Sequence, residues 1–362
     1  MGSQHEPHEK GHDMNTKTAR QIVLGTASAV LAAVLLSGCG LIYKPVGHTL
    51  NHYSLDEAVP YALSSGDLDK TTCGTGLALS QLMGSFSRVI SRPSRTLLST
   101  NLLAAMCSEA QAQDAHLLVL RALHNGETDT ARDDRIIAQR WERITALRRY
   151  QVYRDTVDAY GEFGGQSCPD LSNEMGTDLD ELQFMVGVLT SVQGLLSDIR
   201  ANSSVGIPQN VAAEAGRAVS CLDNRKWWGL PEALEAVVWL SVPGNQPDGA
   251  DPWGQLERSV AIGREQGMAM PAMLYAIAAY GQSDTAREKQ AIKAVAEIYN
   301  QNDTAGRFQI LNEVAYSQAQ YLSDRIWMEA EGHRTPLIAL GSFPGDSRGA
   351  SDDDFDAGSF LE

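Results

Sequence analysis

The sequence predicts an all-α protein, built as an α-solenoid of helical hairpins with degenerate tetratricopeptide-like repeats. Larger apolar residues recur every three or four positions in its longer segments, which is typical of one face of a helix. No strand is expected, because sustained two-residue alternation is missing and no Asn-Gly or Asp-Gly pair joins two β-branched runs. Polar and glycine-containing breaks separate the segments, and helix, short loop, helix is the outline of a solenoid. The breaks fall at 91–94, 125–129, 161–173, 202–208, 241–252, 281–284 and 301–306.

The N-terminal segment, residues 1–38, is predicted to be a leader and signal peptide that is removed. Residues 14–39 read MNTKTARQIVLGTASAVLAAVLLSGC, with a positively charged start at Lys17 and Arg20. The uncharged run from Ile22 to Leu36 suits a signal peptide and is short for a membrane span, which needs about 20 apolar residues. Residues 1–13 are polar and do not suit an export signal, so we expect the signal to begin at Met14.

The run ends in Leu36-Ser37-Gly38-Cys39, which looks like a lipobox. We therefore expect cleavage before Cys39 and attachment of a lipid to its thiol. The alternatives are an ordinary signal peptide with an unrelated cysteine, or a hydrophobic N-terminal helix. Two or three acyl chains give stable anchoring, so the membrane is an expected partner through this lipid. Gly40, in place of Asp, resembles the outer-membrane class of lipoproteins, which predicts the inner leaflet of the outer membrane, facing the periplasm.

The charge and the cysteines limit the remaining possibilities. The chain has 362 residues and a net charge of −16, which argues against nucleic acid as a partner. Besides Cys39, four cysteines remain, and an even number in an oxidising compartment indicates disulfides. Three pairings exist. We expect Cys73–Cys107 and Cys168–Cys221, since each would join neighbouring helices, and four buried free thiols are the alternative.

The predicted domains follow from helix signals along the mature chain. Residues 39–53 are expected to form a lipidated linker, 54–335 a helical repeat-like domain, and 336–362 a disordered acidic tail rich in Gly, Ser and Asp. Ser54–Glu57 and Asp178–Glu181 have the form of capping boxes. Asp251-Pro252 is typical of an N-cap followed by proline at the first helical position.

A long amphipathic helix is predicted between Arg132 and Gly161. Its apolar face would carry Ile137, Trp141, Ile144, Leu147, Tyr150, Tyr153, Val157 and Tyr160. Its other face would carry Arg140, Arg143, Arg148, Arg149 and Arg154, which are expected to be solvated or to form an interface.

No catalytic, metal or cofactor site is predicted, because the chain lacks a Walker A loop, a GxSxG elbow, an HExxH motif and a GxGxxG loop. We therefore do not expect an enzyme. Four of the six tryptophans, Trp227, Trp228, Trp239 and Trp253, fall close together. They indicate either core packing of helix pairs or an aromatic-lined groove for an apolar ligand.

Four blocks carry a resemblance to a known family: Gly40–His48 (GLIYKPVGH), Ala218–Trp228 (AVSCLDNRKWW), Val242–Trp253 and Leu322–Trp327 (LSDRIW). In this order they resemble the TatT component family of TRAP transporters. The resemblance implies a helical, tetratricopeptide-like periplasmic lipoprotein. Its best-known member forms a homotrimer with hydrophobic channels and is thought to associate with a periplasmic substrate-binding protein. No individual binding residue is carried over.

The expected function is therefore that of an accessory component of a TRAP-type uptake system, which binds or relays an apolar or organic-acid ligand. The alternative is a helical scaffold lipoprotein that recruits protein partners at the envelope and binds no small ligand.

Overall fold

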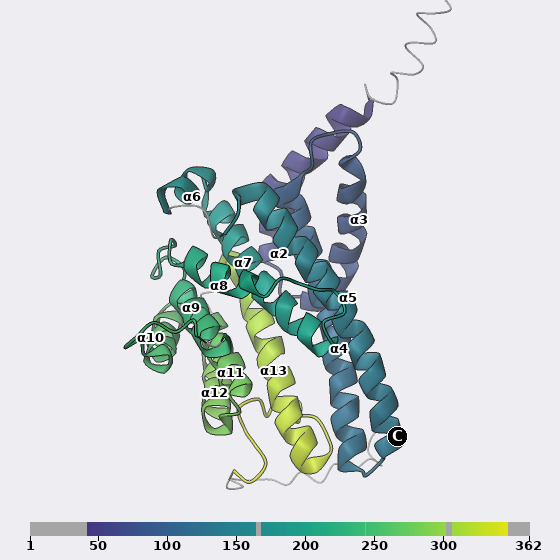
Figure 1. Cartoon of the computed structure of the whole chain (residues 1–362), viewed down its shortest axis with the longest axis vertical. Coiled ribbons are helices and arrows are strands. Elements are labelled where there is room, and N and C mark those ends of the chain that lie inside the picture. The colour runs from purple at the N-terminus through teal and green to yellow at the C-terminus, as the bar shows by residue number, and fades with distance from the viewer. Residues whose placement is uncertain (1–41, 164–167, 243, 302–305, 347–362) are drawn as a thin grey trace, which may run out of the picture.

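The computed structural model describes residues 42–163, 168–242, 244–301 and 306–346, and within these ranges it contains helices and no strand (Figure 1). The predicted all-α class is confirmed. The predicted signal peptide and Cys39, the predicted lipid attachment site, lie outside the described residues. The lengths of the described α-helices vary widely, from 33 residues in α5 to 5 in α2, so the solenoid of regular repeats stays a prediction.

Two long helices, α4 (Ser94–His124) and α5 (Thr128–Tyr160), form an antiparallel hairpin that runs through most of the molecule (Figure 1). The other face of α5 packs against α7 (Asp178–Arg200), and α13 (Gln309–Glu331) lies along α4. The approach of α5 to α7 depends on a glycine, because a Cβ atom at Gly187 would lie 2.2 Å from Oγ1 of Thr156.

Residues 42–53, expected to be a linker, are instead helical and continue into the π-helix η1 (Ser54–Ala58) and α2 (Val59–Leu63). The expected capping box at Ser54 is therefore wrong, because the helix begins upstream and the Ser54 hydroxyl donates to the carbonyl oxygen of Leu50 at 2.7 Å. A second π-helix, η2 (Lys70–Gly76), and α3 (Leu77–Phe86) follow. Gly76 lets η2 lie directly on α4, since a Cβ there would meet the backbone nitrogen of Ala104 at 2.6 Å.

The two remaining cap predictions differ in outcome. The capping box of α7 is formed by Thr177 and Asp180, one residue earlier than expected, because the Thr177 hydroxyl accepts from the Asp180 amide. The N-cap at Asp251 is confirmed: its carboxylate accepts from the Gly254 amide at 3.0 Å, and Pro252 opens the helix.

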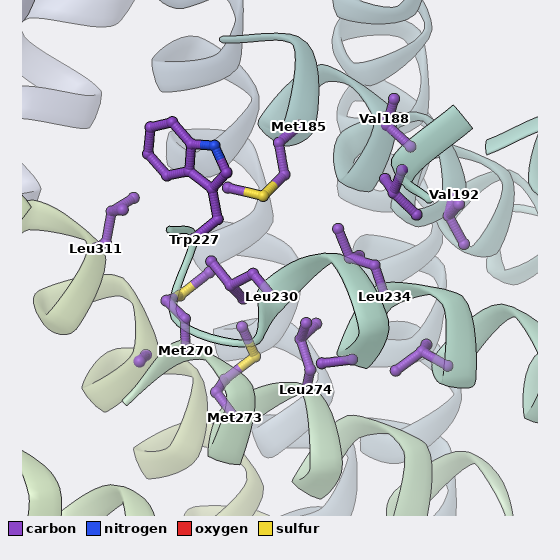
Figure 2. Close-up of a cluster of buried hydrophobic side chains, with 14 of the residues drawn as sticks. Met185, Val188, Val192, Trp227, Leu230, Leu234, Met270, Met273, Leu274 and Leu311 are labelled. Atoms are coloured by element: carbon purple, nitrogen blue, oxygen red, sulfur yellow. The ribbon is translucent and has the colours of Figure 1, made fainter. Parts of the chain in front are cut away.

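The C-terminal half consists of shorter helices that pack in succession and then against α13. They are α8 (Asn210–Val219), α9 (Leu230–Ser241), α10 (Pro252–Glu265), α11 (Met270–Gly281) and α12 (Thr285–Asn300). A short α6 (Cys168–Glu174) precedes them, and the 3₁₀ turn η3 (Gly306–Phe308) leads into α13. Figure 2 shows the core where α7, α9, α11 and α13 meet around Trp227, Met270 and Leu274.

The long helix α5 is present, but its predicted faces are only partly right. Tyr160 is buried and Arg140, Arg143 and Arg154 are exposed, as expected. The buried positions of α5 carry mostly small or polar residues, such as Ala138, Ala146 and Thr156, whereas Ile137 and Leu147 are exposed. The reason is that α5 packs on both α4 and α7, and close approach on two sides requires small side chains. Of the arginines expected in solvent, Arg149 is buried, and Arg148 is half-buried and donates to the carbonyl oxygen of Ala104.

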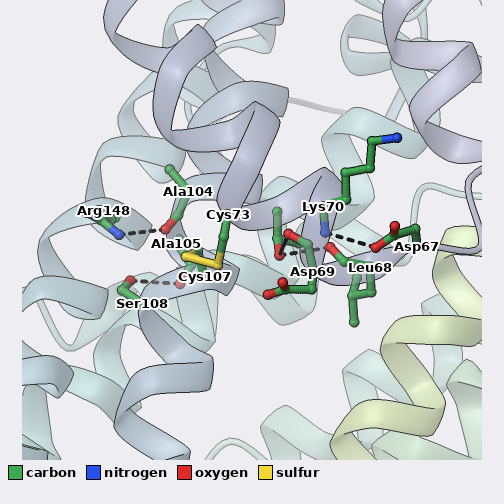
Figure 3. Close-up of a disulfide and its surroundings, with 11 residues drawn as sticks. Asp67, Leu68, Asp69, Lys70, Cys73, Ala104, Ala105, Cys107, Ser108 and Arg148 are labelled. Carbon is green, nitrogen blue, oxygen red and sulfur yellow. Dashed lines mark hydrogen bonds between the residues drawn. A yellow bond between two sulfur atoms is a disulfide. The ribbon is translucent and has the colours of Figure 1, made fainter.

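Two disulfides join Cys73 to Cys107 and Cys168 to Cys221, the same pairs that we expected. The first links η2 to α4 (Figure 3), and the second links α6 to the end of α8.

The C-terminal segment 336–346, expected to belong to a disordered tail, packs on α12 and α13 instead. Phe343 is buried, with the ammonium groups of Lys289 and Lys293 at 5.1 and 5.6 Å from its ring centroid. The indole nitrogen of Trp327 donates to the carbonyl oxygen of Ser342 at 3.0 Å. Residues 347–362 lie outside the described residues.

Candidate functional site

An apolar cavity of about 120 Å³ lies where the N-terminal helices cover α4, α7 and α13. Its wall is formed mainly by aliphatic side chains from five helices, α2, α3, α4, α7 and α13: Val59, Leu63, Leu79, Leu102, Leu103, Met106, Leu179, Leu182, Val186, Ile310, Leu311 and Val314. Both π-helices contribute to it, η1 through Ser54 and Ala58 and η2 through Thr71 and Thr75. Because π-helices are rare and frequently occur at functional sites, two of them on one cavity mark it as the candidate site.

Most of the hydroxyl groups at the cavity wall donate to oxygen atoms of the protein. Thr71 donates to the carbonyl oxygen of Asp67 at 2.7 Å, and Thr100 donates to that of Thr96 at 3.1 Å. Thr96 in turn donates to the side-chain oxygen of Asn51 at 2.7 Å. The cavity therefore offers an occupant dispersion contacts and few hydrogen bonds. An apolar cavity of about 150 Å³ engineered into another protein stays dry and binds benzene, so this one has a suitable size for a small apolar group.

The Cys73–Cys107 disulfide joins two of the segments that line the cavity, although neither cysteine lines it. Cys73 stands between Thr71 and Thr75 in η2, and Cys107 follows Met106 in α4. Figure 3 shows the disulfide joining the two helices next to the turn at Asp67, which accepts from the Lys70 amide at 3.0 Å. This crosslink holds η2 against α4 and therefore fixes one wall of the cavity.

The four clustered tryptophans lie elsewhere, and none of them lines this cavity. Trp227 and Trp228 are buried, and the Trp227 indole nitrogen donates to Oε2 of Glu181 at 2.7 Å. Trp239 and Trp253 are half-buried, and Trp253 lies under the guanidinium of Arg287 at 4.6 Å. The core-packing interpretation therefore fits Trp227 and Trp228, and the structure does not bring the four residues into one groove.

A second, polar pocket of about 60 Å³ lies farther along α4 and is lined by charged groups from α4, α5 and α7. Its most buried basic group is Arg149, which pairs with Glu109 at 2.5 Å. Burial opposes the charge of Glu142, but a hydrogen bond from His116 and the charge of Arg200 hold the pKa of this carboxyl below its ordinary value. With its charges paired inside the protein, this pocket is better suited to joining helices than to catalysis.

Another buried carboxyl, Glu288 in the first turn of α12, predicts a pH-dependent stability. Glu288 is 5% exposed, and burial raises its pKa from 4.5 to about 7, although the charge of Arg325 opposes the shift. The folded state therefore holds this proton more tightly than the unfolded state. The stabilising contribution is complete below pH 4.5 and is lost as the pH rises to about 7.

We expect Glu288→Gln to leave the free energy of unfolding unchanged near pH 4 and to raise it by about 3 kcal/mol near pH 8. Urea unfolding of both proteins at several pH values measures the difference. An equal effect at every pH would contradict the assignment. Glu331→Gln, at an exposed position, is the control and should show no such pH dependence.

Among the described residues, no group of three or more His, Cys, Asp or Glu side chains is placed to hold a metal ion. The helix α7 is long and apolar enough to cross a membrane, but 72% of its apolar window is buried inside the protein, as expected for a core helix.

Comparison of the chain with protein-family models, with curated proteins and with solved structures finds no match in any of the three.

Proposed function

We propose that this chain is a lipid-anchored envelope protein whose helical body binds an apolar ligand in the cavity beneath η1 and η2. The observation that carries the proposal is the cavity itself, an aliphatic pocket of about 120 Å³ in which most of the hydroxyl groups are already bonded to protein. Empty apolar space costs stability, at about 24 cal/mol per Å³ in large-to-small core substitutions, so a pocket of this size is expected to have an occupant.

The lipid anchor and the cavity would be close together along the chain. The proposed lipid attachment site, Cys39, precedes the helix 42–53, and this helix continues into η1 at the cavity wall. From residue 42 to Ser54 a helix rises about 18 Å. An anchored protein would therefore hold the cavity near the membrane surface, where apolar molecules are concentrated. The resemblance to the TatT family supports a role in TRAP-type uptake, with a periplasmic substrate-binding protein and a homotrimer as the proposed partners.

Binding of n-butylbenzene, measured by isothermal titration calorimetry, tests the proposal. The wild type is expected to bind it, and Ala62→Phe should abolish binding because the ring would fill the cavity from α2. The matched control is Ala213→Phe, a substitution of another half-buried alanine on α8, away from the cavity. Failure of the wild type to bind, or equal binding by all three proteins, would contradict the proposal.

The alternative, a scaffold for protein partners, is supported by a different observation. Leu337 and Ile338 are 90% and 95% exposed at a turn in which the Ala339 amide donates to the carbonyl oxygen of Pro336. Two adjacent large apolar side chains in solvent are typical of a contact surface. If n-butylbenzene does not bind, this interpretation becomes the stronger one.

A further inference from the structure

A surface groove of about 260 Å³ runs beside the apolar cavity, between η2, α4 and α13. Met106 on α4 and Val314 on α13 line both the cavity and the groove. These side chains therefore stand between the two spaces. Methionine is unbranched and adapts its shape easily, so movement of Met106 would join the cavity to the groove.

The groove has more polar groups in its wall than the cavity has, and its charged groups are acidic. Its wall includes the carboxylates of Asp69 and Glu313 and the side chains of Gln113, Gln318 and Gln320, and no lysine, arginine or histidine lines it. The carboxylate of Glu313 is fixed in place, because the Tyr299 hydroxyl donates to it at 2.9 Å.

An aromatic ring also faces this groove. Tyr316 lines it, and its ring packs on that of Tyr299, with the centroids 4.4 Å apart. Aromatic faces attract cations, and two carboxylates attract them further. An anionic group would be repelled by both carboxylates and would find no basic side chain along the wall.

The groove has a defined end. The Gln113 amide nitrogen donates to the side-chain oxygen of Gln318 at 2.8 Å, and these two residues separate the groove from the polar pocket around Arg149. From Met106 to Gln113 the helix rises about 10 Å, so a head group that lies in the groove is within about 10 Å of the cavity.

We propose that the ligand is a single-chain amphiphile with a cationic head, an amine or a quaternary ammonium group. The chain fills the apolar cavity, and the head lies in the groove against Asp69, Glu313 and the ring of Tyr316. This inference rests on the proposed function, since it assigns the ligand class of the same cavity and adds the groove as the site of its head.

Three amphiphiles with alkyl chains of seven or eight carbons and different heads test this inference: octyltrimethylammonium, octyl glucoside and octanoate, each below its micelle concentration. In titration calorimetry we expect the cation to bind about tenfold more tightly than octanoate, with the glucoside between them. Added salt should reduce the difference, because it screens charges at an open groove.

The double variant Asp69→Asn/Glu313→Gln should bring the affinities of the cation and octanoate to within about threefold and leave that of the glucoside unchanged. Asn and Gln keep the size of the side chains, and Gln can still accept from Tyr299. The matched control is Asp129→Asn/Glu331→Gln, which makes the same change in net charge at exposed positions and should keep the full preference.

The possible results test separately the cationic head group, the joining of cavity and groove, and the apolar cavity itself. If octanoate binds as tightly as the cation, or if the control variant loses as much preference as the groove variant, the proposal of a cationic head group is wrong. The proposal of apolar binding in the cavity is then unaffected. If n-butylbenzene binds and none of the octyl compounds does, the joined cavity and groove are wrong. If n-butylbenzene also fails to bind, the proposed function itself fails.

Discussion

Replacement of Trp227 by Ala is expected to lower the free energy of unfolding by about 3–5 kcal/mol. Trp227 is 2% exposed and lies in the core formed by α7, α9, α11 and α13 (Figure 2). Its ring contacts those of Trp228 and Phe308 edge-on, with centroids 5.3 and 6.2 Å apart. Truncation would leave a large cavity at the point where these helices meet, and it would remove the hydrogen bond to Glu181.

Urea unfolding followed by circular dichroism measures the loss. Trp253→Ala is the comparison, and we expect a smaller effect because Trp253 is half-buried at the start of α10. Folded Trp227→Ala protein should still bind n-butylbenzene in the cavity beneath η1 and η2, and Ala62→Phe should still abolish binding there, because Trp227 does not line that cavity. If the Trp227→Ala protein had normal stability and no longer bound n-butylbenzene, the result would support a ligand groove lined by the clustered tryptophans.

Local signals in the sequence predicted local structure well. Asp251-Pro252 marks a helix start because both residues act within one turn, through a side-chain acceptor and a fixed φ. The helix around Trp141 could be predicted from the spacing of its larger residues. Its buried face could not, because burial of α5 is decided by two neighbouring helices, and the small residues that allow both contacts give no apolar signal.

The cavity could not be predicted for a similar reason. Its wall combines ordinary aliphatic residues from segments as distant as Val59 and Val314, and none of them forms a motif. The Ser54–Glu57 pattern indicated the start of a helix. In the structure the helix begins upstream and continues through these residues as the π-helix η1, so the sequence pattern did not predict this π-helix at the cavity wall. The Cys73–Cys107 pairing was the one prediction from the sequence that brought together two of the segments at the cavity, η2 and α4.

The second large effect is expected from Arg149→Met, which should lower the free energy of unfolding by about 3–5 kcal/mol. Arg149 is 3% exposed and joins three helices: it is on α5, it pairs with Glu109 of α4 at 2.5 Å, and it donates to the Gln193 carbonyl of α7 at 3.2 Å. Removing the guanidinium leaves the Glu109 carboxylate, whose side chain is 16% exposed, without its partner.

A double-mutant cycle separates the ion pair from packing. Glu109→Leu/Arg149→Met should be more stable than Arg149→Met alone, because an apolar pair replaces a buried charge that has lost its partner. Some loss should remain, since Gln193 and the Ser197 hydroxyl lose the donor that Arg149 provides. Urea unfolding of the four proteins measures the coupling. If the double variant lost the sum of the two single effects, Arg149 would act through its contacts with α7 alone, and the hairpin would not depend on the charge of Glu109.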